Sequence, residues 1–175
     1  MMATRWLASV VIIAAWGGTM GTALPAPSSK PDPEVAERFG ALTQLAEKKD
    51  YLTAISAISK FLDGHPQPPW HERALYLLAH CSKKAGLAKE ALVLYKKASQ
   101  DYPALGDYAD FNVTTILSEL GSHLSALSEA EAFLENHPLS RLRTKVRLLK
   151  AEALAGLGRT AEAESIFRAL LSGDL

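Results

Sequence analysis

The clearest hydrophobic pattern in the chain lies between Leu139 and Leu171, where apolar residues recur at the spacing of a helix. Because that spacing places them on one face, the pattern predicts two amphipathic helices. They are joined at 156–159 by a Gly-Leu-Gly-Arg turn, in which Gly156 and Gly158 would supply left-handed backbone at little cost. Neither helix can bury its whole apolar face alone, so neighbouring helical hairpins are expected to complete the core.

Weaker copies of this pattern occur upstream at a regular period. Prolines that close successive hairpins stand at positions 66, 103 and 138, which are 37 and 35 residues apart. Turn glycines stand at positions 86, 121 and 158, which are 35 and 37 residues apart. The helices predicted on this basis are Pro33–Lys48, Tyr51–Asp63, Trp70–Ala85, Ala88–Asp101, Leu105–Leu120 and His123–Asn136, followed by the pair within Leu139–Leu171. Two independent markers with one period indicate a repeat protein built from four helical hairpins.

Residues at fixed places in each hairpin resemble the tetratricopeptide repeat (TPR) family. The matching residues are Tyr51, Ala54 and Pro66 in the first hairpin; Gly86, Ala91, Tyr95, Ala98 and Pro103 in the second; Gly121, Ala126 and Pro138 in the third; and Gly158, Ala163 and Phe167 in the fourth. Ala130 replaces the large aromatic and Lys49-Asp50 replaces the turn glycine, so the third and first hairpins are expected to pack less well. The resemblance covers about Pro33 to Leu171 and implies an all-α fold, with about four TPR-like helix pairs in a right-handed superhelix.

Segments 101–121 and 133–171 also resemble the N-terminal superhelical region of periplasmic soluble lytic transglycosylases. In that family the helical region precedes a lysozyme-like domain that cleaves peptidoglycan, and the catalytic glutamate lies in a Glu-Ser pair. The one such pair here, Glu164-Ser165, falls inside a predicted repeat helix, and the sequence holds no counterpart of the catalytic domain. A non-catalytic module is therefore the first interpretation, and the helical portion of such an enzyme, without its catalytic domain, is the alternative.

Composition narrows the function classes. A chain of 175 residues that is 48% hydrophobic can bury the core of one compact domain. Nineteen basic residues balance nineteen acidic ones and the isoelectric point is about 7.0, which argues against nucleic acid as a partner. No sustained alternation of apolar and polar residues predicts strands, so the all-α interpretation holds.

The N-terminus has the layout of a secretory signal peptide. Arg5 supplies a positive start, Trp6–Trp16 is apolar, and Gly21-Thr22-Ala23 or Leu24-Pro25-Ala26 offers a small-residue cleavage site. The apolar run is shorter than the roughly 20 residues of a membrane span, so membrane contact is expected only through this segment, with an uncleaved anchor as the alternative. The predicted organisation is a signal peptide at 1–23, a flexible linker at 24–32 and a TPR-like helical repeat domain at 33–175, in a protein exported to a bacterial periplasm.

The motifs contain no constellation typical of catalysis or metal binding. Cys81 is the only cysteine, so no internal disulfide can form, and it is predicted to be a buried helix residue. His65 and His137 precede closing prolines and are expected to be structural, because zinc ligands are usually closely spaced on one face. The glycines at 156–158 lack the lysine and the spacing of a phosphate loop. No catalytic residue, metal or cofactor is predicted.

Candidate binding residues follow from repeat geometry, since the first helix of each hairpin is expected to line a concave groove. The candidates are Arg73, Tyr76, His80 and Lys83 in the second hairpin, Tyr108, Phe111 and Asn112 in the third, and Arg143 and Arg147 from the basic cluster Arg141, Arg143, Lys145, Arg147 and Lys150 in the fourth. Aromatic rings beside basic and hydrogen-bonding groups suit an extended peptide or a glycan such as peptidoglycan. Ordinary packing or a solvated helix face is the alternative for each residue.

The last hairpin carries apolar residues where a helical array usually ends in a polar face, namely Ile166, Phe167, Leu170 and Leu171. This face is expected to be covered by a partner, by self-association through Phe167 and Leu171, or by further chain. Taken as a whole, the pattern predicts an exported, non-enzymatic scaffold that binds a protein or peptide, or a cell-wall partner, in its concave groove.

Overall fold

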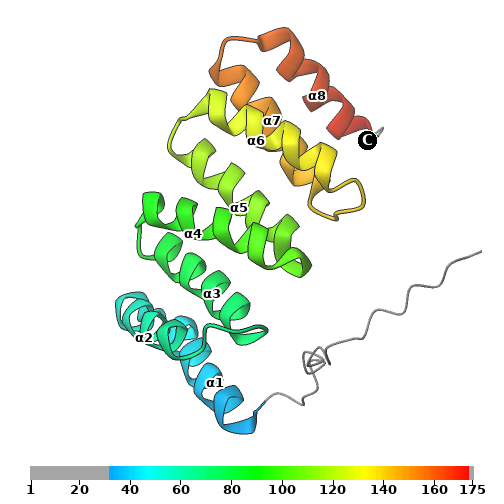
Figure 1. Cartoon of the computed structure of the whole chain (residues 1–175). Helices are drawn as coiled ribbons and strands as arrows, with labels where there is room; N and C mark the ends of the chain where they lie inside the picture. Colours follow the sequence, from blue (N-terminus) through cyan, green and yellow to red (C-terminus); the bar gives the residue numbers. More distant parts are fainter. Residues whose placement is uncertain (1–31, 174–175) are drawn as a thin grey trace, which may run out of the picture. The chain divides into compact units, whose positions relative to one another are not determined.

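The computed structural model describes residues 32–173, and the chain from Pro33 onward forms one compact unit. The predicted signal peptide and residues 24–31 of the predicted linker lie outside the described residues. Within the described range the chain has no strands, and its helices are α1 (Pro33–Glu47), α2 (Tyr51–Gly64), α3 (Trp70–Lys84), α4 (Ala88–Asp101), a short 3-10 helix (Pro103–Leu105), α5 (Gly106–Glu119), α6 (His123–Asn136), α7 (Arg143–Gly156) and α8 (Thr160–Ser172) (Figure 1). The all-α prediction is confirmed.

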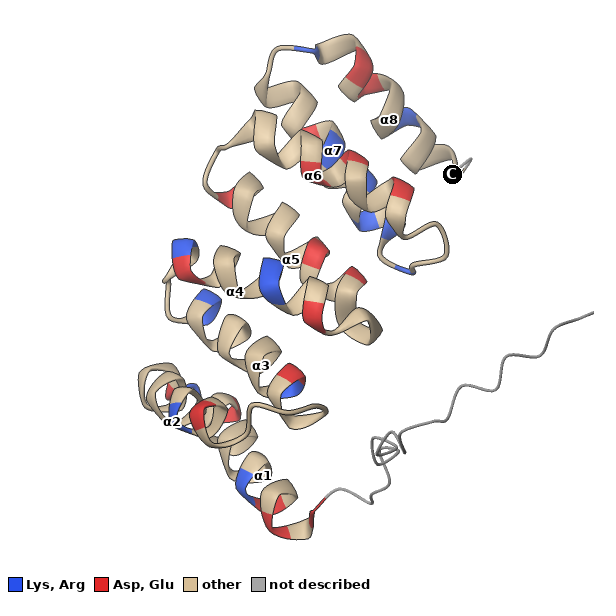
Figure 2. Cartoon of the chain, in the orientation of Figure 1, with Lys and Arg blue, Asp and Glu red and all other residues tan. Residues whose placement is uncertain are grey.

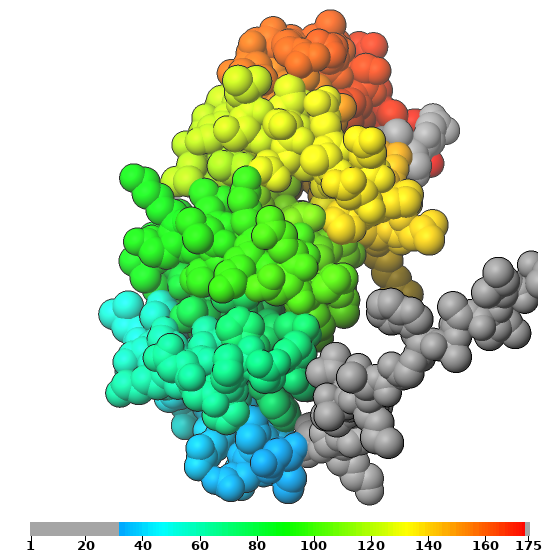
Figure 3. Space-filling model, in the orientation of Figure 1, coloured from blue at the N-terminus to red at the C-terminus, as the bar shows by residue number. Residues whose placement is uncertain are grey.

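Each helix packs against the next one in the chain, so the helical unit consists of the four hairpins α1/α2, α3/α4, α5/α6 and α7/α8. First helices of neighbouring hairpins also touch, α1 with α3 and α5 with α7. The hairpins follow one another in chain order, and side chains of successive hairpins are in contact in the space-filling view (Figure 3). Helices α4 and α6 are second helices of their hairpins, and each packs against α5 (Figure 1).

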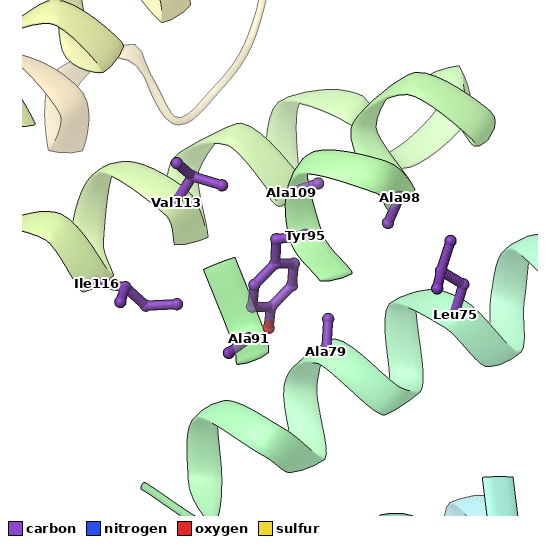
Figure 4. Close-up of a cluster of buried hydrophobic side chains, with 8 residues drawn as sticks. All are labelled: Leu75, Ala79, Ala91, Tyr95, Ala98, Ala109, Val113 and Ile116. Atoms are coloured by element: carbon purple, nitrogen blue, oxygen red, sulfur yellow. The ribbon is translucent and has the colours of Figure 1, made fainter. Parts of the chain in front are cut away.

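The core is divided into clusters, and most of them join one hairpin to the next. The largest lies between α3, α4 and α5, and its buried members are Leu75, Ala79, Ala91, Tyr95, Ala98, Ala109, Val113 and Ile116 (Figure 4). The fully buried ring of Tyr95 occupies its centre, at the place of the large aromatic in the TPR pattern. Alanines on the facing helices let the backbones approach this ring closely, and burying a large apolar side chain contributes about 1.5–3 kcal/mol.

The third hairpin buries an aromatic residue one turn beyond the place of the large aromatic in the TPR pattern. Ala130, at the place of the large aromatic, is fully buried, and Phe133 lies one turn later on the same helix with only 1% of its surface exposed. Phe133 joins Leu142 and Val146 in a cluster between α6 and α7. Relative to the TPR pattern, the buried aromatic residue of this hairpin stands one helical turn later, and Phe133 supplies its ring to the core.

The turns between paired helices require left-handed backbone, as the glycine spacing predicts. Gly86, Gly121 and Gly158 have φ angles of 81°, 68° and 74°. Lys49 occupies the equivalent place in the first hairpin with φ 64°, a conformation that costs a residue with a Cβ atom about 1–2 kcal/mol. The neighbouring Asp50 offsets part of this cost, because its side chain accepts a hydrogen bond of 3.4 Å from the backbone N–H of Thr53 and caps α2.

Gly156 does not adopt the left-handed backbone predicted for it. It is the last residue of α7, and a Cβ atom placed there would lie 2.5 Å from Cε1 and Nδ1 of His123 on α6. Such a distance is far inside van der Waals contact. Gly156 is therefore a packing glycine that admits the His123 ring, and Gly158 alone provides the turn conformation in this hairpin.

Helix α7 begins at Arg143, four residues after the beginning of the segment Leu139–Leu171 that is predicted to contain the last helix pair. The intervening loop is held by Ser140, whose hydroxyl donates to Asp107 Oδ2 at 2.6 Å and accepts from the backbone N–H of Leu142 at 3.1 Å. These bonds compete with helix formation and tie the loop to α5. The predicted start at Leu105 also shifts by one residue, because Pro103–Leu105 forms the 3-10 helix.

Candidate functional site

Lys83 is the central charged residue on the side where α3 and α5 meet. Its Nζ donates to Asn112 Oδ1 at 3.3 Å and lies 3.8 Å from Glu119 Oε1. Only 19% of its side chain is exposed, and this burial lowers the pKa of the ammonium group. Asn112 is itself oriented, because its amide donates to the backbone oxygen of Tyr108 at 2.8 Å. The structure thus joins two predicted site residues that stand far apart in the sequence. We call the surface formed by Tyr76, His80, Lys83, Tyr108 and Asn112 the α3–α5 face.

Two tyrosines and a histidine complete this face. Burial raises the pKa of the Tyr76 phenol, and the nearby Tyr108 and Asp107 raise it further. Tyr76 of α3 therefore interacts electrostatically with both residues of α5. The Tyr76 ring packs edge-on against the Tyr95 ring, with the ring centres 5.5 Å apart. This contact attaches the Tyr76 side chain to the core. Burial lowers the pKa of His80, as do Lys84 and Lys83, so its imidazole is neutral at pH 7 and can both donate and accept a hydrogen bond.

Arg73 and Phe111 lie at the edges of this group and have other contacts. The Arg73 guanidinium is 5.3 Å from the centre of the Trp70 ring, a cation–π arrangement near the start of α3. Phe111 is half-buried and packs against the cluster that contains Phe133 and Val146. Phe111 therefore serves packing between α5, α6 and α7 as well as facing the surface.

Two of the basic residues of α7, Arg143 and Lys150, contact the preceding helix α6 or its end. Arg143 Nη1 donates to the backbone oxygen of Leu134 at 2.6 Å and to that of His137 at 3.4 Å, so it satisfies carbonyl groups at the end of α6. Lys150 Nζ lies 2.9 Å from Glu131 Oε1, also on α6. Arg147 lies between Arg143 and Lys150 on one stripe of α7 by helical spacing. The structure therefore does not bring Arg143 to Lys83, and Arg147 as an anion contact stays a prediction.

Two acidic groups that sequence reasoning missed belong to the same region. Glu119 stands seven residues after Asn112, which places both on one face of α5, and it lies within reach of Lys83. Asp107 raises the pKa of Tyr76 and accepts the hydrogen bond from Ser140. The helical spacing from Asn112 could have identified Glu119, whereas Asp107 has no signal in the sequence beyond its place in the first turn of α5.

Three further residues have side chains of a kind that can bind metals or act in catalysis, namely His65, His137 and Cys81, and each of them is engaged in packing or in a structural contact. The His65 ring stacks on Phe61 with centres 4.1 Å apart, and His137 Nε2 lies 2.8 Å from Asp110 Oδ2. Cys81 is buried and its thiol pKa is raised by burial, which disfavours the reactive thiolate. Among residues 32–173 no group of three or more His, Cys, Asp and Glu side chains is placed to hold a metal ion.

The described helices show neither a broad basic surface nor a membrane-spanning segment. Helices α5 and α6 carry acidic residues but no lysine or arginine, whereas most charged residues of the neighbouring α7 are basic (Figure 2). Of the helices in the described part of the chain, none combines the length and the apolar character needed to cross a bilayer. In the last hairpin Ile166 and Phe167 pack toward α6 and α7, whereas Leu171 is 88% exposed. Self-association through this end stays a prediction.

Neither a protein-family model nor a curated protein matches the sequence. Among solved structures, one described as "MamA RS-1 ArsTM double mutant" matches with a TM-score of 0.68 and 12% identity, over 81% of this chain and 75% of that chain. A putative kinesin light chain with TPR-like repeats from Podosopora anserina matches at 10% identity over 82% of this chain and 96% of that chain, with a TM-score of 0.44. A tetratricopeptide repeat protein from Parabacteroides merdae matches at 19% identity over 81% and 67%, with a TM-score of 0.37.

These comparisons do not show the likeness to lytic transglycosylases that segments 101–121 and 133–171 suggest. At such low identities a structural match establishes the fold and leaves the activity open. The eight described α-helices, their hairpin pairing and the turn glycines agree with that match. The chain therefore has a TPR-like fold of stacked helical hairpins.

Proposed function

We propose that this protein is an exported, non-catalytic interaction module that binds a peptide segment of a partner protein on the α3–α5 face. The observation that supports this most directly is Lys83, a largely buried cation held by Asn112 and close to Glu119. A cation held in place in this way has already lost much of its side-chain freedom and hydration, so it can accept an anionic ligand group at low further cost.

The surroundings of Lys83 favour a peptide over a small inorganic anion. Tyr76 and Tyr108 offer ring surfaces on the same face as Lys83, and neutral His80 offers a further hydrogen bond. An extended peptide that carries a carboxylate next to apolar side chains would use all of these groups. Peptidoglycan, which carries short peptides with free carboxylates on a glycan chain, is the second candidate ligand for the same face.

The test is a peptide-binding measurement on the full chain and on Lys83→Met. A random-peptide display selection supplies the probe peptides, and calorimetry measures their affinity for each variant. Loss of a charge-assisted hydrogen bond of about 1.5–3 kcal/mol predicts a tenfold or greater loss of affinity for peptides with a carboxylate. Lys97→Met, on the exposed side of α4, is the matched control and should bind as the unaltered protein does.

Three outcomes would contradict the proposal. Unchanged affinity in Lys83→Met, and in the triple variant that also replaces Arg73 and Tyr76 by alanine, would remove the α3–α5 face as the binding site. Co-sedimentation with purified peptidoglycan that depends on Lys83, with no peptide selected, would assign the face to the cell wall. Release of soluble fragments from that peptidoglycan by the purified protein would contradict the non-catalytic assignment and favour the transglycosylase alternative.

Export rests on the N-terminal sequence and has its own test. Residues 1–32 fused to a reporter enzyme that is active only outside the cytoplasm should give activity in bacterial cells. Replacing Ile12 and Ile13 by arginine interrupts the apolar segment and should abolish that activity. Equal activity from both fusions would count against a signal peptide.

A further inference from the structure

A second surface lies between the second helices α4 and α6, where α5 forms the floor. Two adjoining hollows of about 330 and 250 Å³ occur there, and both are lined by Lys96 of α4 and Glu129 of α6. The two hollows therefore form one groove that this pair divides. We call it the α4–α6 groove, and it shares no residue with the α3–α5 face.

One half of the groove, the larger hollow, has three leucines in its lining, beside Ser125, Ser128 and the Lys96–Glu129 pair. Leu92 of α4 and Leu117 of α5 are half-buried in its floor, where they pack against the cluster around Tyr95. Leu124 of α6 stands at the edge with 71% of its surface exposed. Because the floor is fixed by the core and the edge is in water, an aliphatic side chain placed here would remove both its own surface and that of Leu124 from solvent.

The division between the halves is an ion pair with unequal partners. Lys96 Nζ lies 2.6 Å from Glu129 Oε1, and the lysine side chain is 55% exposed whereas that of Glu129 is 30% exposed. The other half of the groove contains a second carboxylate, Asp110, which contacts His137. Glu129 is the less exposed member of the pair, and the more exposed, flexible Lys96 is the member that a ligand could displace.

We propose that the α4–α6 groove is a docking site for a partner protein segment that carries an aliphatic side chain and, within one helical turn, an arginine or lysine. The aliphatic group occupies the hollow over Leu92 and Leu117, and the cation pairs with Glu129 in place of Lys96. Arginine fits this role best, because its guanidinium can contact both oxygens of one carboxylate. Side chains one helical turn apart are about 5–6 Å from each other, which suits two adjoining subsites.

The consequence is a module with two binding surfaces of opposite charge preference. The α3–α5 face presents Lys83 to an anionic group, whereas the α4–α6 groove presents Glu129 and Asp110 to a cationic one. Both surfaces contact α5, so one protein would hold two partners at neighbouring places. The groove assignment does not depend on the function proposed for the α3–α5 face.

The experiment is a random-peptide display selection on the immobilised full chain, followed by affinity measurement with the selected peptides. The expected result is enrichment of a leucine, isoleucine or methionine followed within four positions by arginine or lysine. Leu124→Ser and Glu129→Gln should each weaken binding of such a peptide at least fivefold. Lys96→Ala should strengthen it several-fold, because Glu129 loses its competing partner.

Matched controls separate docking from loss of structure. Val93→Ser removes a side chain that is 70% exposed on α4 and lines neither hollow, so it should leave binding unchanged. Lys83→Met should also leave it unchanged, and circular dichroism should show the same helix content in every variant. Selection of no apolar–basic motif, weaker binding by Lys96→Ala, or equal losses in Val93→Ser and Leu124→Ser would overturn the proposal.

Discussion

Replacing Gly156 by alanine should destabilise the protein, although alanine is ordinarily the better helix residue. The added Cβ would lie 2.5 Å from Cε1 and Nδ1 of His123 and 2.6 Å from its Cγ. Since three atoms of one planar ring are involved, the whole ring must swing out, or α7 must move away from α6. Overpacking of this kind costs about 1–3 kcal/mol, and the helix propensity of alanine returns about 0.5–1 kcal/mol at most. The net expectation is a loss of about 1 kcal/mol, within a range of about 0–2.5 kcal/mol.

The same substitution should change sign when the ring is absent. In a His123→Ala background the clash disappears, so Gly156→Ala should raise the free energy of unfolding by about 0.5–1 kcal/mol. Urea unfolding of the four proteins, followed by far-UV circular dichroism, closes the double-mutant cycle. A stabilising effect of Gly156→Ala in both backgrounds would refute the assignment of Gly156 as a packing glycine.

Three further predictions concern single residues. Lys49→Gly should raise stability by about 0.5–1 kcal/mol in urea unfolding by relieving its left-handed backbone, whereas Lys48→Gly, in ordinary backbone, should lower it. The Tyr95 hydroxyl is buried and has no hydrogen-bond partner among the described residues, so Tyr95→Phe should add about 1 kcal/mol. That gain should grow above pH 10, because burial raises the pKa of Tyr95 in the folded protein, so the unfolded chain loses the phenol proton first and the unaltered protein loses stability as pH rises. Urea midpoints at neutral and alkaline pH test both points. Burial lowers the pKa of His80 from 6.5 in the folded protein, so the unfolded chain binds the proton more readily and the native protein loses stability as pH falls below 6.5. His80→Gln should lose less stability over the same pH interval in urea unfolding. An equal loss in both proteins would contradict a lowered pKa of His80.

The helices and most of the turns were predictable because they depend on local physics. Apolar spacing of three to four residues defines a helix face wherever it occurs, and the glycines at 86, 121 and 158 mark backbone that other residues adopt only at a cost. The residue at which α7 begins was not predictable, because the loop before it is held by a hydrogen bond between Ser140 and Asp107, which stand 33 residues apart. A hydrogen bond between residues so far apart in the sequence leaves no trace in the spacing of apolar and polar residues.

The candidate site was predictable only in part, for a related reason. Helical spacing on α3 groups Tyr76, His80 and Lys83, but the register between α3 and α5 decides that Lys83 meets Asn112 and Glu119. The same limit explains Arg143. Its charge is plain in the sequence, whereas its hydrogen bonds to carbonyl groups at the end of α6 depend on where the loop before α7 turns.

Because the core is split into clusters between adjacent hairpins, local unfolding should begin at the terminal helices and spread toward the middle of the unit. Helix α1 contributes one buried residue, Leu42, and α8 contributes one, Ala163, whereas α3 contributes six. Backbone amides of α1 and α8 should therefore exchange with solvent first, and those of α3 to α5 last. Both proposed binding surfaces include residues of α5, so the two partners would dock on the slowest-exchanging part of the chain, and terminal fraying would not disturb them.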